Sequence, residues 1–261
     1  MTAQGTVQLD FAGLTDVGRS RARNEDHFTI DPEAGLAVVC DGMGGHAGGD
    51  IASKTAIEVI RDTIRRDGKP GCDGAALVRS AVQQANQRLV GLNHQRGYPE
   101  GRGMGTTVVG LWQPAGTSGV LVFHAGDSRL YRLRSGELRQ LTRDHSLYQA
   151  WLDAGGHGQA PHRNIIIRAL GTNTDVGPDV DAQAIAPGDL FLICSDGLNG
   201  MLSDREIADS LGKGGELPEL CKRLVDLANE KGGHDNVTVV LAREVSGALA
   251  RETSGSPARG A

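Results

Sequence analysis

Two long amphipathic segments follow one another directly in this chain, and their order most constrains its fold. Small and branched apolar residues recur at helical spacing in residues 49–66 and again in residues 73–94, so both segments are expected to be helices. Short β-branched runs flank the pair at 7–15, 26–30, 36–40, 105–111, 119–124, 130–133, 138–141, 189–194 and 237–242. Further helices are expected at 147–154, 203–211 and 217–231. Strand and helix do not alternate regularly, which predicts an α+β fold of antiparallel sheets with helices outside.

Composition and charge narrow the class of protein. The net charge of −5 disfavours a nucleic-acid partner, which usually meets a basic stripe. No secretory signal or bilayer-length apolar stretch is recognised, so no membrane association is expected. Cys40, Cys72, Cys194 and Cys221 show no paired spacing and are interpreted as free thiols of a reducing compartment. The prediction is a cytoplasmic monomer with one domain over residues 1–245 and a disordered tail over 246–261.

Aspartates stand at the ends of several predicted strands. Asp41 ends an apolar run and opens a glycine-rich loop, Asp127 and Asp196 follow two further runs, and Asp26 and Asp235 precede others. Taken singly, each could belong to an ordinary turn, and that alternative stays open. Taken together, converging carboxylates would repel one another unless a cation neutralised them. An all-oxygen set favours Mg²⁺ or Mn²⁺, and two such ions can generate hydroxide from water at neutral pH.

Eight stretches in order resemble the metal-dependent Ser/Thr protein phosphatases of type 2C, the PPM family, in their compact bacterial form. They are "RARNED" (21–26), "DGMGGHAGG" (41–49), "GMGTT" (103–107), "HAGDSRLY" (124–131), "LTRDHS" (141–146), "IIRALG" (166–171), "SDGL" (195–198) and "HDNVTVVL" (234–241). The resemblance implies a four-layer α/β/β/α sandwich, in which helix pairs flank two antiparallel sheets.

The resemblance also implies roles for individual acids. Asp41 matches the aspartate that bridges two metal ions, and Gly42 matches the glycine whose carbonyl binds one of them. Asp196 and Asp235 match the remaining direct ligands, and Asp26 matches an acid that touches metal through water. Asp127 matches the ligand of a third ion in bacterial members, which it shares there with Asp196.

Two further roles come from the same resemblance. Arg21 matches the arginine that holds the substrate phosphate, although Arg19 and Arg23 are equally near in sequence. Some members carry a histidine, proposed as the general acid, at the position of Met43, which cannot donate a proton. His46 is displaced from that position and is interpreted as a loop residue. The general acid is therefore unassigned, with water on the metal as one candidate.

The region after "LTRDHS", residues 146–164, corresponds to the family's variable flap. Its His157 and His162 are interpreted as solvated loop residues. Asn236, beside Asp235, is assigned a structural role.

The resulting prediction is a Mn²⁺- or Mg²⁺-dependent phosphatase with two ions per chain and room for a third. It would hydrolyse phosphoserine and phosphothreonine in phosphorylated proteins through a dimetal-activated hydroxide, and so oppose a cognate Ser/Thr kinase in signalling. A phosphatase of one dedicated regulator or of a small phosphoester is not excluded. The main alternative is an inactive phosphoprotein-binding pseudophosphatase. A dinucleotide-binding protein is disfavoured. Its fold needs a strand soon after the helix that follows the glycine-rich loop, whereas a second long helix is expected here.

Overall fold

The computed structural model describes residues 8–44, 48–99 and 101–245. Its first half contains β1 (Leu9–Asp16), β2 (Asp26–Asp31), β3 (Leu36–Met43), α1 (Gly48–Asp67), α2 (Gly74–Gln95), β4 (Gly105–Thr106), β5 (Val108–Trp112) and β6 (Gly119–Ala125). The second half contains β7 (Arg129–Arg134), β8 (Glu137–Gln140), α3 (Leu147–Asp153), β9 (Asp179–Ala184), β10 (Leu190–Cys194), α4 (Asp196–Asn199), α5 (Asp204–Gly212), α6 (Leu217–Glu230) and β11 (Val237–Glu244).

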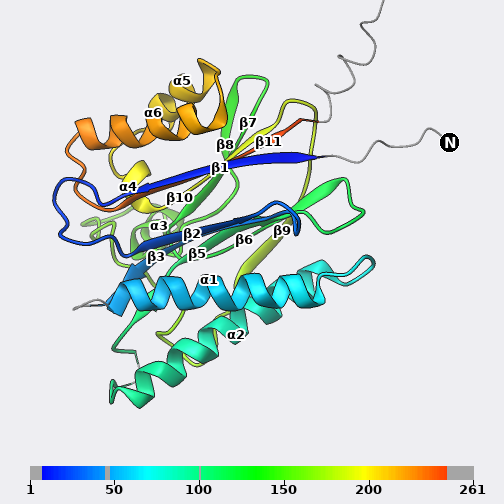
Figure 1. Cartoon of the computed structure of the whole chain (residues 1–261). Helices are drawn as coiled ribbons and strands as arrows, with labels where there is room; N and C mark the ends of the chain where they lie inside the picture. Colours follow the sequence, from blue (N-terminus) through cyan, green and yellow to red (C-terminus); the bar gives the residue numbers. More distant parts are fainter. Residues whose placement is uncertain (1–7, 45–47, 100, 246–261) are drawn as a thin grey trace, which may run out of the picture.

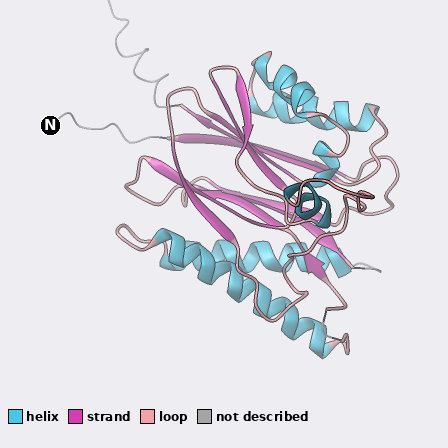
Figure 2. Ribbon diagram, turned by 180° about the vertical axis from the view of Figure 1, so that it is seen from behind, coloured by secondary structure: helices cyan, strands magenta, loops and turns pink. Residues whose placement is uncertain are grey.

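The strands form two antiparallel sheets that lie face to face. One has the order β1-β11-β10-β7-β8, and the other has the order β2-β3-β5-β6-β9 with β4 added beside β3. Helices α1 and α2 cover the outer face of the second sheet, while α5 and α6 cover the first (Figure 1). The reverse view shows the same layers (Figure 2). The expected α/β/β/α sandwich is confirmed.

The alternation of side chains along each strand produces three apolar layers. In β3, Leu36, Val38 and Cys40 pack toward α1 and α2, whereas Ala37 and Val39 pack between the sheets. The side chains of β11 alternate in the same way: some pack toward α6 and the others pack between the sheets. Because successive side chains point to opposite faces of a strand, each buried strand contributes to two layers.

Two sequence expectations need correction. The run 105–111 is not one strand but β4 and β5, interrupted at Thr107. There the backbone N–H of Asp41 donates to the Thr107 hydroxyl, 3.0 Å away, in place of a backbone carbonyl, while the Thr107 N–H still donates to the Asp41 carbonyl at 2.9 Å. Strand β9 was not expected, because its sequence "DVDAQA" is polar. It is an edge strand formed by pairing with β6, from Gly119↔Ala184 to His124↔Asp179.

The order of the helices and the state of the cysteines test further expectations from the sequence. Helix α2 follows α1 through the loop at residues 68–73, and the next strand begins at Gly105, so the dinucleotide-binding alternative is wrong. All four cysteines are free thiols. Among the helices of residues 8–44, 48–99 and 101–245, none has the length and apolar character needed to cross a bilayer. The predicted tail, 246–261, lies outside the described residues.

Candidate metal centre

The strand register gathers the predicted acids at one edge of the sandwich. Asp26 begins β2 and lies opposite Asp41 in β3. Asp196 follows β10, Asp235 precedes β11, and Asp127 lies in the turn from β6 to β7. Asp26 and Asp41 continue the alternation that places Phe28 and Val39 between the sheets. These two carboxylates therefore lie on the inward face of their strands, at the end of the apolar layer between the sheets.

Three of these carboxylates carry an oxygen that is buried and lacks a hydrogen-bond partner in the described part of the chain. The atoms are Asp26 Oδ1, Asp127 Oδ1 and Asp196 Oδ1. Asp26 is only 3 % exposed and Asp127 only 6 %. Leaving a buried polar atom without a partner costs about 1–3 kcal/mol, so three together indicate a ligand.

The raised pKa values of the acids also indicate a ligand. Burial is the main cause that raises the pKa of Asp26 to about 7; Asp196 and Asp235 contribute to the rise, and the hydrogen bonds from Ser195 and Thr238 oppose it. Burial and Asp196 raise the pKa of Asp127 to about 7. The pKa of Asp41 is raised well above its ordinary value by burial first and by the neighbouring acids second. A divalent cation would reverse these shifts, since it favours the ionised carboxylates.

Gly42 lies where two backbone segments meet. A Cβ at this position would lie 2.1 Å from the carbonyl oxygen of Gly49 and 2.6 Å from that of Glu25. The backbone N–H of Gly42 donates to the same Glu25 oxygen at 3.2 Å. Only glycine permits this approach. It lets the backbone next to Asp41 contact the backbone next to Asp26.

The structure distinguishes the three candidate arginines. Arg21 Nη2 donates to Asp235 Oδ2 at 2.7 Å, and its side chain is 53 % exposed at the mouth of the site. Asp235 is the main cause that raises the pKa of this guanidinium, and Asp41 and Asp196 add to it. Arg19 instead lies 3.6 Å from Asp16, and the backbone carbonyl of Arg23 accepts a hydrogen bond from Asn236 Nδ2.

The donor set fits hard divalent cations. It consists of carboxylate oxygens, and three of the acids carry an oxygen without a partner in the described residues; Mg²⁺ and Mn²⁺ prefer such oxygen ligands. A surface cavity of about 590 Å³ lies elsewhere, at the other end of β2 and β3, where Asp31 and Trp112 line it. The chemistry of the acids therefore marks the site, and this cavity does not.

Comparison with known proteins identifies the family. Residues 18–242 match the family model described as Protein phosphatase 2C. The chain is 35% identical over 243 residues to a putative protein phosphatase 2C-type of Streptococcus pyogenes, covering 89% of this chain and 96% of that protein. The chain belongs to the protein phosphatase 2C family.

This phosphatase 2C member is also similar in sequence and in structure to the phosphatase PstP. It is 38% identical over 249 residues to the serine/threonine protein phosphatase PstP of Mycobacterium tuberculosis, covering 92% of this chain. The match spans about half the length of that relative, 46%. The crystal structure of the PstP catalytic domain with two manganese ions superposes with a TM-score of 0.81 at 36% identity, covering 92% of this chain and 99% of that one.

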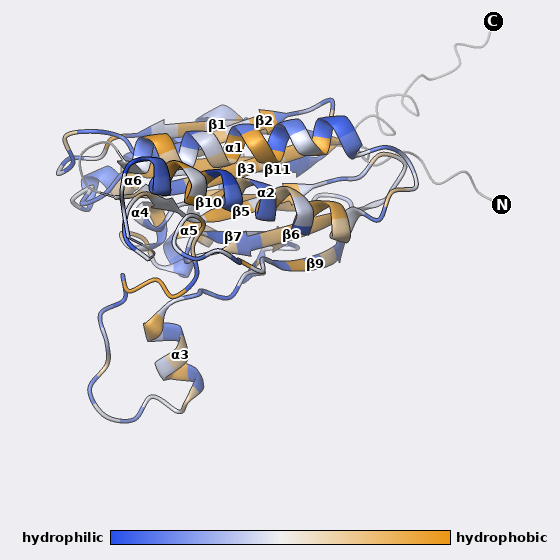
Figure 3. Cartoon of the chain, turned by 90° about the horizontal axis from the view of Figure 1, so that it is seen from below, coloured by the Kyte–Doolittle hydropathy of each residue, from blue (hydrophilic) through white to orange (hydrophobic). Residues whose placement is uncertain are grey.

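The predictions for Met43, for His46 and for the flap of this phosphatase 2C chain can be compared with the structure. Met43 pairs with Gly105 of β4, and its thioether offers no proton. His46 lies outside the described residues. The flap contains α3, which stands away from the sandwich on a long loop (Figure 3). His157 and His162 are exposed there.

Several site residues were missed by sequence reasoning. The hydroxyls of Ser195 and Thr238 each donate to Asp26 Oδ2 at 2.7 Å, which leaves Oδ1 free to face the site. Thr238 lies on the inward face of β11, and Ser195 continues the inward alternation of β10 one residue beyond its end, so the strand pattern could have placed both inward but not beside Asp26. The hydrogen bonds of Asn236 agree with the structural role assigned to it. Its side chain accepts from the N–H of Glu25 and donates to the carbonyls of Val17 and Arg23. It thereby fixes the loop that carries Arg21.

Proposed function

We propose that this chain hydrolyses phosphoserine and phosphothreonine in phosphorylated proteins, using two Mn²⁺ or Mg²⁺ ions. The observation that carries the proposal is the group of three unpartnered, buried carboxylate oxygens beside the exposed guanidinium of Arg21. The manganese-bound PstP structure supports two ions in a relative of the same fold.

The residues that would hold the two ions are Asp41, the Gly42 carbonyl, Asp196 and Asp235, with Asp26 beside them. Asp127 would hold a third ion together with Asp196. Two divalent ions would lower the pKa of a water molecule enough to provide a hydroxide nucleophile at neutral pH.

The chain's own residues would position the reactants. Arg21 has a planar guanidinium that can donate to two phosphate oxygens and stabilise the charge that develops on them. Asp235 orients this guanidinium through the 2.7 Å hydrogen bond. Ser195 and Thr238 fix the carboxylate of Asp26, so that its free oxygen is already oriented before substrate binds.

A cysteine nucleophile is a poor alternative. Burial raises the pKa of Cys194 to about 12 and also raises the pKa of Cys40, so neither thiol ionises near neutral pH. Thiols, unlike thiolates, are weak nucleophiles. The reaction is therefore proposed as direct, in-line attack on phosphorus without a covalent phosphoenzyme.

The cellular setting follows from this activity. A protein phosphatase of this kind would oppose a cognate Ser/Thr kinase in a signalling pathway. We also propose a cytoplasmic location, which the four free cysteines support, and a monomeric state.

The test is hydrolysis of a phosphothreonine peptide with Mn²⁺, with EDTA, and by an Asp41→Asn variant. Activity should require Mn²⁺ and should fall in the variant by at least about 100-fold, as for loss of a group that holds the reacting centre. Asp209→Asn is the control, because this exposed acid lies on α5, outside the acid cluster. Activity that survives both EDTA and Asp41→Asn would refute the metal mechanism. Manganese binding without hydrolysis would support the pseudophosphatase alternative.

A further inference from the structure

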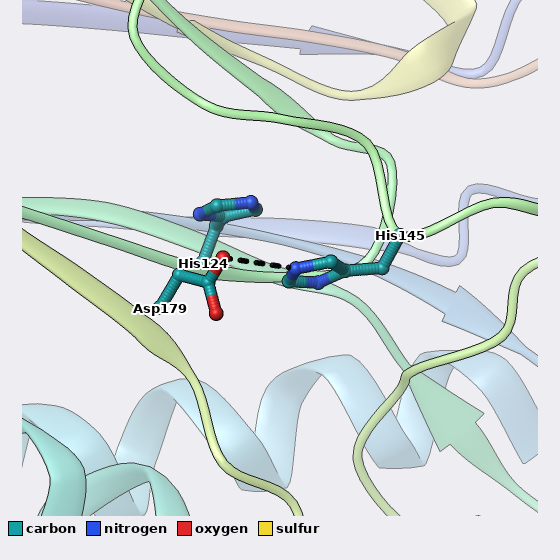
Figure 4. A group of neighbouring side chains, drawn as sticks. All are labelled: His124, His145 and Asp179. Atoms are coloured by element: carbon teal, nitrogen blue, oxygen red, sulfur yellow. Dashed lines mark hydrogen bonds and ion pairs between the residues drawn. The ribbon is translucent and has the colours of Figure 1, made fainter. Parts of the chain in front are cut away.

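His145 makes contacts that join three separate parts of the fold. It directly precedes Ser146, the residue that caps α3 at the start of the flap. Its backbone N–H donates to the carbonyl of Gly126 at 2.9 Å, and the N–H of Gly126 donates back to His145 Nδ1 at 3.2 Å. On its other side, His145 Nε2 lies 3.3 Å from Asp179 Oδ2 of β9 (Figure 4).

These contacts define one tautomer of the imidazole. Nδ1 accepts a hydrogen bond from Gly126, so it carries no proton, and the ring proton lies on Nε2, where it is donated to Asp179. Burial, His124 and Arg168 lower the pKa of His145 to about 4, which agrees with a neutral ring. Arg168 donates to Asp179 Oδ1 at 2.7 Å and so fixes the carboxylate that orients the histidine.

The same three side chains, His124, His145 and Asp179, lie close enough together to resemble a metal site. The two rings are stacked, however, with centroids 4.5 Å apart and planes only 8° apart. The lone pairs of parallel rings lie in parallel planes and do not converge on one ion. His124 Nε2 is also within 2.8 Å of the Arg143 carbonyl. Hydrogen bonding, not coordination, explains this group.

The segment fixed by His145 reaches the candidate metal centre in two ways. Gly126 directly precedes Asp127, whose Oδ1 is buried and unpartnered in the described part of the chain. The next residue, Ser128, bonds the Thr107 hydroxyl at 2.7 Å, and that hydroxyl accepts from the backbone N–H of Asp41. A shift of the turn at 126–128 would therefore move Asp127 and remove a support of Asp41.

The turn itself has little freedom to move elsewhere. Gly126 has a φ of +124°, and a Cβ there would lie 2.7 Å from the side chain of Thr107. The turn is thus packed tightly on the Thr107 side and fixed by His145 on the other.

We propose that His145, oriented by Asp179, is a positioning residue that holds the 126–128 turn in the geometry that the metal centre requires. The inference rests on the proposed function. It assigns no contact between His145 and metal or substrate. Partners behind the residues that hold a metal commonly tune its binding.

The first measurement is Mn²⁺ binding by calorimetry to the apo chain. His145→Ala should weaken binding by about five-fold, the factor that loss of one neutral hydrogen bond implies. His145→Asn should bind within about two-fold of wild type, because its amide oxygen takes the place of Nδ1 and accepts from Gly126. His94→Ala is the control, since it removes an exposed imidazole from α2. Melting curves in EDTA verify that each variant folds.

The second measurement keeps the test decisive if His145→Ala does not fold. Imidazole ¹⁵N shifts of the wild-type chain should show His145 as the neutral Nε2–H tautomer. A protonated Nδ1, wild-type Mn²⁺ affinity in folded His145→Ala, or equal loss in His145→Asn would overturn the inference while leaving the proposed function intact. A wild-type chain that binds no Mn²⁺ would refute the proposed function, and the inference with it.

Discussion

Replacing Gly42 by alanine tests how closely the backbone geometry controls the candidate metal centre. The added Cβ would lie 2.1 Å from Gly49 O and 2.6 Å from Glu25 O, whereas ordinary contact begins at 3.4 Å. Backbone must therefore move by more than 1 Å, because neither obstacle is a flexible side chain. Glu25 adjoins Asp26 and Gly42 adjoins Asp41, so both acids would be displaced. A misplacement of about 1 Å can lower an enzymatic rate by about 100-fold.

The assay is phosphothreonine-peptide hydrolysis at saturating Mn²⁺, together with Mn²⁺ calorimetry and thermal melting. Gly91→Ala is the matched control, because Gly91 lies within α2 and a Cβ there would meet no atom within 4 Å. That control should keep full activity and gain about 1 kcal/mol of stability, as helix-interior glycine replacement usually does. Folded Gly42→Ala with wild-type activity and Mn²⁺ affinity would refute the reasoning.

Three further predictions follow from other contacts. Saturating Mn²⁺, at about 100 times its Kd, should stabilise the chain by about 2.7 kcal/mol and raise its Tm by about 5–10 °C, and an unchanged Tm would contradict the site. Arg21→Lys should lower kcat/KM by about ten-fold because the guanidinium fork is lost, whereas Arg19→Lys should stay near wild type. The hydrogen bond from Arg65 lowers the pKa of buried Asp31. This pair should therefore stabilise the fold fully above the ordinary carboxyl pKa, about 4, and lose its effect as pH falls through the lower folded value. In urea unfolding, Arg65→Met should be less stable than wild type at neutral pH, with a difference that shrinks below about pH 4; a difference independent of pH would contradict it.

Sequence patterns were sufficient where burial and periodicity coincide. Helices α1 and α2 begin and end within one residue of their predicted bounds, because each presents a continuous apolar stripe to one sheet face. The hairpin from β7 to β8 turns at Ser135 and Gly136, both with positive φ, between the strands expected at 130–133 and 138–141. Patterns failed at β9, whose acidic residues carry no strand signal of their own.

Some residues of the candidate site could likewise be identified from the sequence, and others could not. Asp26, Asp41, Asp127, Asp196 and Asp235 could be named from the chain because each interrupts or borders an apolar run. Only the family resemblance favoured Arg21 over Arg19 and Arg23, because all three are equally near in the chain. That distinction depends on Asp235, 214 residues away in the chain, to which Arg21 donates. Ser195 and Thr238 likewise acquire a role only when β2, β10 and β11 meet.

By itself, the sequence determined the helices other than the short α4, most of the strands and the acids at their ends, since these depend on local periodicity and on where polarity replaces an apolar run. The tertiary structure decided which oxygens stay unpartnered, which arginine faces the acids, and that His145 contacts the turn before Asp127. Those features depend on antiparallel register and on hydrogen bonds between distant segments. Local sequence does not contain them, because each partner is supplied by a different strand.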